Sequence, residues 1–210
     1  MAASDLIIGL GHKKRVGKDT LGRMLKCDLI QRGYDVHCLA FADALKDCAH
    51  TLFGHRGLKE KEWYDDYPFE RGWVLSGIEK TPRQIWIELG NAVRRIDPDL
   101  WVKKVVDRIR RQARCFAYRP RAFIITDVRF PNEAHAIHSW GGVLVKVNRP
   151  ALEPTDDPSD CALDYYALWD MYVNNGGSLE NLKVAASQLV ETLISLNHLE
   201  TQIRKINEQS

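Results

Sequence analysis

Residues 6–20 read Leu-Ile-Ile-Gly-Leu-Gly-His-Lys-Lys-Arg-Val-Gly-Lys-Asp-Thr, an apolar run followed by a turn rich in glycine and lysine. The run Leu6–Leu10 predicts a buried strand, and Leu21, Met24, Leu25 and Leu29 follow it at helical spacing. A strand, a glycine-rich turn and a helix in this order are typical of a loop that binds phosphate groups. This stretch therefore decides the fold class that we expect.

A bound polyphosphate needs several backbone N–H donors aimed at one point and a cation that reaches its outer phosphates. Lys18 stands where the turn enters the helix, so its ammonium can fold back over phosphates that the helix N-terminus also attracts. The candidate phosphate-binding residues are those of the turn: Gly11, His12, Lys13, Arg15, Val16, Gly17, Lys18, Asp19 and Thr20.

The turn departs from the G-x-x-x-x-G-K-[ST] pattern at two positions. His12 stands where the first glycine is expected, with Gly11 one residue earlier, so the loop is either one residue longer or tolerates a side chain. Asp19 replaces the hydroxyl residue after Lys18, and a carboxylate is a good ligand for Mg²⁺. Thr20 is the alternative metal ligand or a contact to an inner phosphate. A surface turn without a ligand is the alternative, and the order of strand, turn and helix favours phosphate binding.

Composition indicates one enzyme-sized domain spanning residues 1–210, because 45% hydrophobic residues can build a substantial core. The net charge of +2 is too small to imply nucleic-acid binding. Five cysteines without C-x-x-C spacing indicate neither a disulfide framework nor a zinc site, so we expect a reducing cytoplasm. No apolar stretch is long enough to cross a membrane, and the N-terminus lacks a signal-peptide core.

Strand-like runs alternate with helical patterns, which predicts an α/β fold with a mostly parallel sheet covered by helices on both faces. The expected strands are 6–10, 36–41, 122–126, 143–147 and 171–173, and the expected helices are 19–32, 42–52, 82–95, 99–113, 132–140 and 179–196. Residues 54–80 lack periodicity and form either a substrate-covering insertion or a decorative one. For the aromatic side chains of 63–73 we favour packing over stacking on a substrate base.

The strand 122–126 leads into Asp127, and Arg129 follows two residues later. An acid at this edge of a parallel sheet can lie beside Mg²⁺ and the transferred phosphate, and the arginine can grip phosphate with two N–H groups. Asp127 can equally serve as a cap of the next helix.

The segment Thr81-Pro82-Arg83 opens an amphipathic helix. Thr81 is suited to capping and Pro82 to the first helical position. Arg83 opposes the helix dipole, which makes sense if an anion binds there, although a solvated surface arginine is the alternative.

Four ordered motifs together resemble the bacteriophage-type deoxynucleoside monophosphate kinases: Gly17–Thr20, Thr81–Arg83 with Gly90, Trp101-Val102, and Thr126-Asp127-Val128-Arg129 with Asn132-Glu133. Residues 147–150 and 174–179 are similar to the closing segments of that family, so the resemblance covers nearly the whole chain.

The resemblance implies a three-layer P-loop kinase fold and transfer of the ATP γ-phosphate to a deoxynucleoside monophosphate. It implies that Lys18 holds ATP, that Asp19 or Thr20 together with Asp127 serves Mg²⁺, and that Arg83 and Arg129 clamp the acceptor or the transferred group. It also makes Asp43, Lys46 and Arg149 candidates for the substrate site.

Three other functions share part of this pattern. A GTPase should carry an Asn-Lys-x-Asp motif, which the chain lacks. Dephospho-coenzyme A kinases share the loop. A nucleic-acid-binding P-loop ATPase would use the basic residues of 103–121, although the apolar stripe of 102–109 indicates that these basic side chains form the solvent-exposed face of a helix. The tail 197–210 could pack on the same domain or form a homodimer contact.

Overall fold

The computed structural model describes residues 5–114, 118–150 and 158–208, so that Cys115 lies outside the described residues. The chain divides into two compact units. The first unit comprises residues 1–40 and 108–210, and the second comprises residues 41–107. Among the described residues, no helix has the length and apolar composition needed to cross a membrane.

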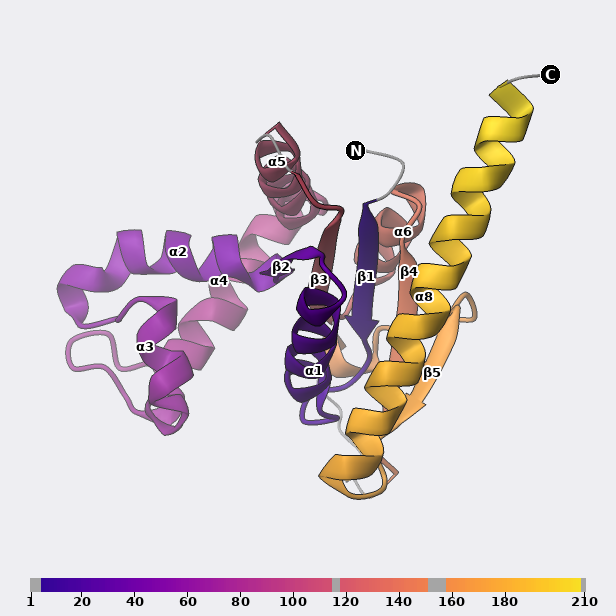
Figure 1. The fold of residues 1–210 in the computed structure, drawn as a ribbon. Coiled ribbons are helices and arrows are strands. Elements are labelled where there is room, and N and C mark those ends of the chain that lie inside the picture. The colour runs from indigo at the N-terminus through magenta and orange to yellow at the C-terminus, as the bar shows by residue number, and fades with distance from the viewer. Residues whose placement is uncertain (1–4, 115–117, 151–157, 209–210) are drawn as a thin grey trace. The chain divides into compact units, whose positions relative to one another are not determined.

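The first unit is built on a five-stranded sheet with the order β2-β3-β1-β4-β5, in which every pairing is parallel (Figure 1). Each strand lies where the sequence predicts one: β1 (Leu6–Gly11), β2 (Asp35–Leu39), β3 (Arg121–Val128), β4 (Val143–Asn148) and β5 (Met171–Asn174). In a parallel sheet all carboxyl ends share one edge, so the residues that follow β1, β3 and β4 gather there.

Helices cover both faces of this sheet. Ile8 and Leu10 belong to the core that includes α1 (Lys18–Gln31) and α8 (Leu179–Glu208). Gly9 lies between them in the strand and faces Ile137 of α6 (Pro131–Ser139) instead, because successive residues of a strand point to opposite faces. The unit is therefore a three-layer α/β/α sandwich, and the predicted fold class is confirmed.

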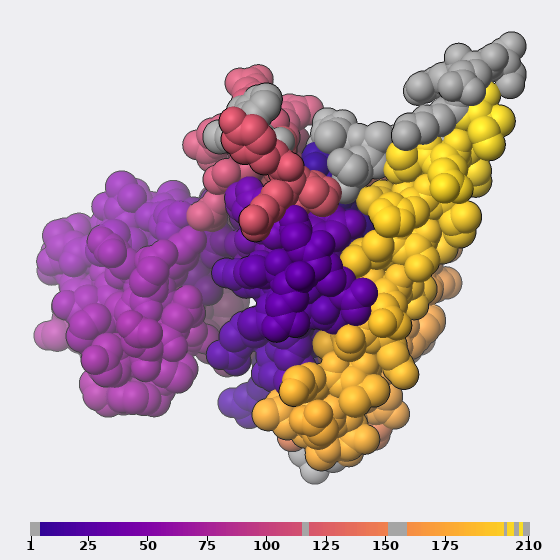
Figure 2. Space-filling view, in the orientation of Figure 1, coloured from indigo at the N-terminus to yellow at the C-terminus, as the bar shows by residue number. Residues whose placement is uncertain are grey.

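The last helix is longer than predicted. We expected it to end at Leu196, but α8 runs on to Glu208, since no glycine or proline interrupts the tail. Its first half packs along α1, as Figure 2 shows for the yellow and indigo segments. Further along, Leu196, Leu199, Ile203 and Ile206 are between 42% and 63% exposed. The tail thus presents an apolar stripe to solvent.

The second unit is helical. It comprises α2 (Phe41–Phe53), the 3-10 turn η1 (Gly54–Arg56), α3 (Lys61–Asp66), the 3-10 turn η2 (Pro68–Gly72) and α4 (Pro82–Ile96). The insertion 54–80 therefore contains one short helix and two turns that the sequence did not indicate. α5 (Leu100–Arg114) spans the boundary between the units.

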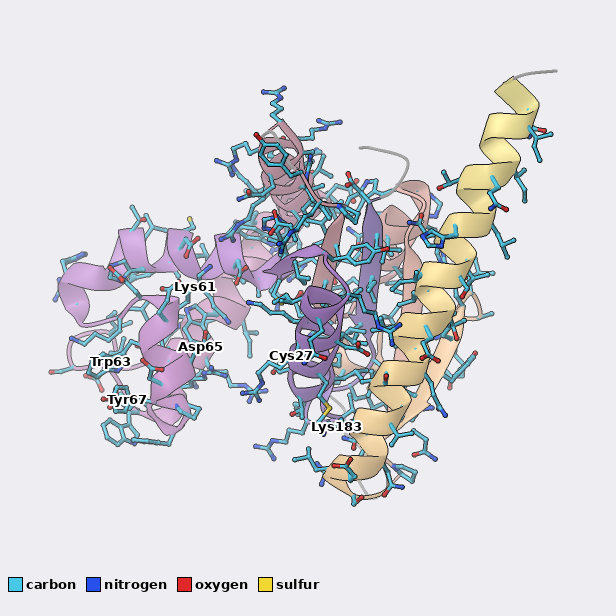
Figure 3. All side chains as sticks on the ribbon, viewed as in Figure 1. Cys27, Lys61, Trp63, Asp65, Tyr67 and Lys183 are labelled. Carbon is cyan, nitrogen blue, oxygen red and sulfur yellow. The ribbon has the colours of Figure 1, made fainter. Side chains whose placement is uncertain are left out.

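The five aromatic side chains of 63–73 pack, but Tyr64 is the one among them that is buried, and the other four pack against one another. Tyr64 is buried and its ring meets Trp86 of α4 edge-on at 5.2 Å. The others are 40–60% exposed, and their rings follow one another at centroid distances of 4.5, 6.3 and 5.5 Å: Trp63, Tyr67, Phe69 and Trp73. Figure 3 labels Trp63 and Tyr67. A helix of six residues buries one face only, and Tyr64 occupies that face.

Candidate active site

The loop between β1 and α1 adopts a backbone that bends back on itself. His12, Arg15 and Gly17 all have positive φ angles, of 91°, 60° and 99°. His12 therefore keeps the left-handed conformation that the missing glycine of the motif would provide, and histidine tolerates this conformation better than most side chains do. The backbone N–H of His12 donates to the carbonyl oxygen of Val128 at 3.3 Å, which ties the loop to the end of β3.

Lys18 is the first residue of α1 and is only 6% exposed. Its ammonium points back into the loop and donates to the carbonyl oxygens of His12, at 3.2 Å, and Lys13. Burial, with a smaller contribution from the nearby Arg129 guanidinium, lowers the pKa of Lys18 to about 8. This buried cation at a helix N-terminus is suited to an anion.

Three carboxylates act in the opposite direction on Lys18. Asp19, Asp127 and Asp160 each raise its pKa through their negative charge, in that order of strength. The structure thus brings the predicted site residues Lys18, Asp19, Asp127 and Arg129 into one electrostatic neighbourhood at the carboxyl edge of the sheet. Asp160 belongs to the same neighbourhood, although the sequence analysis did not select it.

Two glycines of the loop are required by close packing. A Cβ on Gly11 would come within 2.6 Å of the Trp169 ring, and a Cβ on Gly17 would come within 2.3 Å of the Asn175 amide nitrogen. That amide donates to the carbonyl oxygen of Val16 at 2.9 Å and so supports the loop from the other side. Asn175 stands in the segment 174–179 that resembles the kinase family, but its role could not be assigned from the sequence.

Two further acids hold the loop, and sequence reasoning missed both. Asp164 accepts a hydrogen bond from His12 Nε2 at 3.0 Å and forms an ion pair with Lys13 Nζ at 3.1 Å. Asp160, in the short helix α7 (Pro158–Cys161), accepts from the backbone N–H of Lys14 at 3.0 Å. The feature of the sequence that could have pointed to them is that both acids lie between two predicted strands, four residues apart.

Arg129 is anchored at both of its ends. Its backbone N–H donates to the buried Glu133 carboxylate at 2.9 Å, and the same oxygen accepts from Phe130 N–H at 3.2 Å. Its guanidinium donates from Nη1 to Asp160 Oδ1 at 2.6 Å. The backbone N–H and the guanidinium of Arg129 are thereby both held by carboxylates.

The remaining predicted residues of the first unit lie at the same edge of the sheet. Asp19 is exposed and Thr20 half-buried in the first turn of α1, Arg15 is exposed at the tip of the loop, and Arg149 is exposed directly after β4. These positions suit residues that act only when a ligand is present.

Arg83, Asp43 and Lys46 belong to the second unit. Arg83 is exposed in the first turn of α4. Thr81 and Gln84 form a capping box there, of which the sequence predicted the role of Thr81. In α2, the Asp43 carboxylate pairs with Lys61 Nζ at 3.4 Å, and Lys46 Nζ lies 5.5 Å from the centre of the Trp86 ring.

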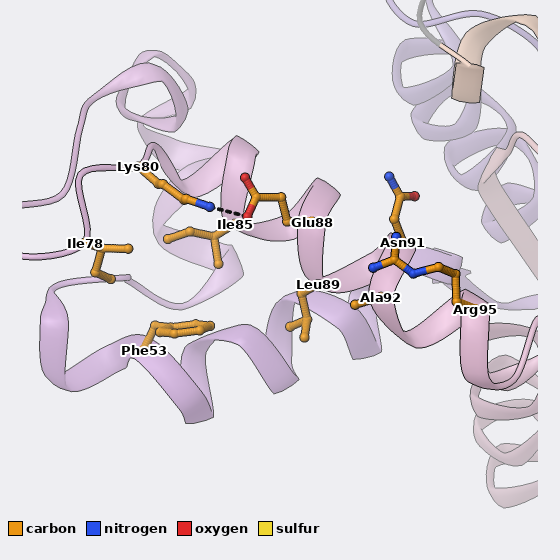
Figure 4. A pocket seen from close by; sticks show the side chains of 9 residues that line it. All are labelled: Phe53, Ile78, Lys80, Ile85, Glu88, Leu89, Asn91, Ala92 and Arg95. Carbon is orange, nitrogen blue, oxygen red and sulfur yellow. Dashed lines mark hydrogen bonds and ion pairs between the residues drawn. The ribbon is translucent and has the colours of Figure 1, made fainter.

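A cavity of about 550 Å³ lies within the second unit, between α2 and α4 (Figure 4). Its walls are mainly apolar, and the Lys80–Glu88 ion pair, Asn91 and Arg95 supply its polar groups. The volume is within the range of small-molecule sites.

The residues of the loop fit a nucleoside triphosphate with magnesium. The buried Lys18 ammonium and the N-terminus of α1 supply positive charge, and the oxygens of Asp19, Thr20 and Asp127 are of the type that Mg²⁺ prefers. Among the described residues, no three His, Cys, Asp or Glu side chains are grouped to hold a metal.

No protein-family model matches the chain. A 75-residue stretch is 32% identical to a protein of Acanthamoeba polyphaga mimivirus that is named "Putative deoxynucleotide monophosphate kinase". This chain resembles the deoxynucleotide monophosphate kinases. The match spans 35% of this chain and 39% of the mimivirus protein, so it covers less than half of either.

Two solved structures are similar over most of their length. The crystal structure of APE1195 has a TM-score of 0.41 at 13% identity, covering 91% of this chain and 98% of its own. Shikimate kinase from Aquifex aeolicus has a TM-score of 0.40 at 12% identity, covering 89% and 97%. Because both TM-scores are below 0.5, the assignment of the fold depends on the sheet order and the loop described above.

Proposed function

We propose that this protein is an ATP-dependent deoxynucleoside monophosphate kinase. It transfers the γ-phosphate of ATP to the 5′-phosphate of a deoxynucleoside monophosphate and releases ADP and the deoxynucleoside diphosphate, a precursor for DNA synthesis. The observation that carries the proposal is the buried Lys18 ammonium, which points into the loop beside Asp127 and Arg129. The ordered motifs and the mimivirus relative support the choice of substrate.

On this proposal the chain supplies charge and position rather than a covalent intermediate. An oxygen of the acceptor phosphate forms the new bond to the γ-phosphorus while the bond from that phosphorus to the β–γ bridging oxygen breaks. Lys18 holds the donor phosphates, and Arg129 neutralises charge on the transferred group. Magnesium shields the phosphate charges when it is bound, and Asp19 or Thr20 together with Asp127 holds it.

The residues of the acceptor side of the proposed site follow from the family resemblance. Arg83 clamps the acceptor phosphate, and Asp43 and Lys46 contact the monophosphate substrate. Arg149, which follows β4 in the first unit, completes the cationic surroundings. Positioning two anions for in-line transfer is the main catalytic task in this chemistry, which explains why several cations are needed.

The proposal is tested by incubating the protein with Mg-ATP and each of the four common deoxynucleoside monophosphates in turn. We expect ADP and the matching diphosphate from at least one of them, and none from Lys18→Ala protein that remains folded. Dephospho-coenzyme A serves as the competing acceptor. Failure with all four monophosphates would overturn the proposal, and turnover of dephospho-coenzyme A alone would replace it.

Arg83→Ala tests the acceptor clamp. We expect kcat/KM for the monophosphate to fall about 100-fold, the effect of removing one charge-stabilising group from such a site, while ATP binding persists. Arg110→Ala, which removes an exposed arginine of α5, is the matched control. An unchanged kcat/KM in Arg83→Ala would show that the clamp is misassigned.

A further inference from the structure

The Asp160 carboxylate lies where burial of an unpaired charge would cost much free energy. Its side chain is completely buried, with a relative exposure of 0%. Burying a carboxylate is unfavourable unless cations and hydrogen-bond donors compensate for the water that it loses. The partners of Asp160 therefore indicate why the charge is there.

All described partners of Asp160 belong to the proposed active site. Oδ1 accepts from the backbone N–H of Lys14 at 3.0 Å and from Arg129 Nη1 at 2.6 Å. Oδ2 pairs with Lys14 Nζ at 3.1 Å. One carboxylate thus joins the phosphate-binding loop to the end of β3.

This contact determines where Arg129 can point. Glu133 fixes the backbone N–H of Arg129, and Asp160 fixes the Nη1 end of its guanidinium. A guanidinium has five N–H donors in a planar fork, so one bond to Asp160 leaves others in a set direction. Lys18 Nζ donates to loop carbonyl oxygens of His12 and Lys13, and Arg129 shares the Asp160 carboxylate with Lys14 of the same loop, so both cations are held at this loop. Two cations held together in this way form a preorganised site for an anion.

We propose that Asp160 is a positioning residue that orients Arg129 toward the phosphate group held by the loop and fixes the loop at Lys14. The inference rests on the proposed kinase function for its activity readout only. Asp160 does not touch the substrate and acts through Arg129.

The test is a double-mutant cycle, which measures coupling between two side chains. Asp160→Asn keeps the size of the side chain and removes its charge, and Arg129→Ala removes its partner. We expect Asp160→Asn alone to lower kcat by about 10- to 100-fold, as misplacing one charge-stabilising group does. In the Arg129→Ala background the same change should lower kcat by a clearly smaller factor, because only the contacts of Asp160 with Lys14 are left to lose.

Asp164→Asn is the matched control. It makes the same substitution four residues away, on an acid that contacts His12 and Lys13 and has no described contact with Arg129. Its fold-effect on kcat should be the same in both Arg129 backgrounds. A merely structural role of Asp160 would lower the melting temperature without this non-additivity, and equal fold-losses of kcat in both backgrounds would overturn the proposal.

A second measurement needs neither turnover nor a variant that folds. In the wild-type protein, NMR of the arginine side chains should show hindered rotation of the Arg129 guanidinium. Free rotation would overturn the proposal even if Asp160→Asn did not fold. Because this readout uses the ligand-free protein, it also separates failure of this inference from failure of the proposed function.

Discussion

The Lys18 ammonium is buried, and burial lowers its pKa into a range where the protein can be titrated. Its pKa is about 8 in the folded protein against 10.5 ordinarily. Between these values the unfolded chain holds a proton that the folded protein lacks. The free energy of unfolding of the nucleotide-free protein should therefore rise from pH 8 to pH 10.5, and the destabilising contribution is fully present below pH 8.

Nucleotide affinity should change in the opposite direction. Bound phosphate favours the ammonium form of Lys18, so the dissociation constant of a non-hydrolysable ATP analogue should increase above pH 8, by up to about tenfold per pH unit. Calorimetric titrations at several pH values check this. Lys18→Arg, whose guanidinium stays charged, should bind with much less dependence on pH, and an equally steep dependence in that variant would contradict the assignment.

His12 illustrates how a side chain can occupy a position normally reserved for glycine. Its φ of 91° is unfavourable for most residues, and its bond to Asp164 holds it there. We predict that Asp164→Asn weakens ATP binding about fivefold, equivalent to about 1 kcal/mol for one hydrogen bond. In His12→Gly protein, which needs no such support, the same substitution should weaken binding by a smaller factor, because only the ion pair of Asp164 with Lys13 is then lost. Equal effects in both backgrounds would show that Asp164 acts elsewhere.

At the scale of elements, the first turn of α4 holds a structural motif and a proposed functional residue side by side. Thr81 and Gln84 form a capping box, and Arg83 between them is the proposed acceptor clamp. Thr81 accepts from the backbone N–H of Gln84 at 3.2 Å, and the Gln84 side chain accepts from Thr81 N–H at 2.8 Å. Thr81→Ala should lower the free energy of unfolding by about 1 kcal/mol, and Thr81→Ser should retain most of it. Urea denaturation measures both, and equal losses in the two variants would contradict the role of the hydroxyl group.

The strands and long helices follow from local pattern, whereas the short elements do not. Apolar runs of strand length predicted all five strands, and helical spacing predicted the six long helices, because a buried stripe or run is visible within a single segment. The turns of 54–72 and the helix α7 are too short to show a period. The aromatic side chains there are mostly exposed for the same reason, since short helices leave most of their faces uncovered.

At the scale of the molecule, the exposed stripe of α8 raises the question of self-association. Leu196, Leu199, Ile203 and Ile206 are spaced at alternating intervals of three and four residues, as in helices that pair along a seam. We propose that this stripe forms a homodimer. Light scattering after size exclusion should give twice the chain mass of 24.1 kDa, and Leu199→Asp with Ile203→Asp should restore the single mass. A wild-type protein that elutes with the mass of one chain would refute the proposal.

The sequence by itself determined the sheet, its covering helices and the loop that ends in Lys18, since each is encoded in the periodicity or turn residues of one contiguous segment. Only the tertiary structure revealed what holds that loop. Asp160, Asp164 and Asn175 reach it from 146 to 159 residues away, and each does so through one or two polar contacts. Contacts between distant residues leave no periodic pattern in the chain. The glycine-rich loop was therefore visible in the sequence, but the carboxylates that orient it became visible only in the fold.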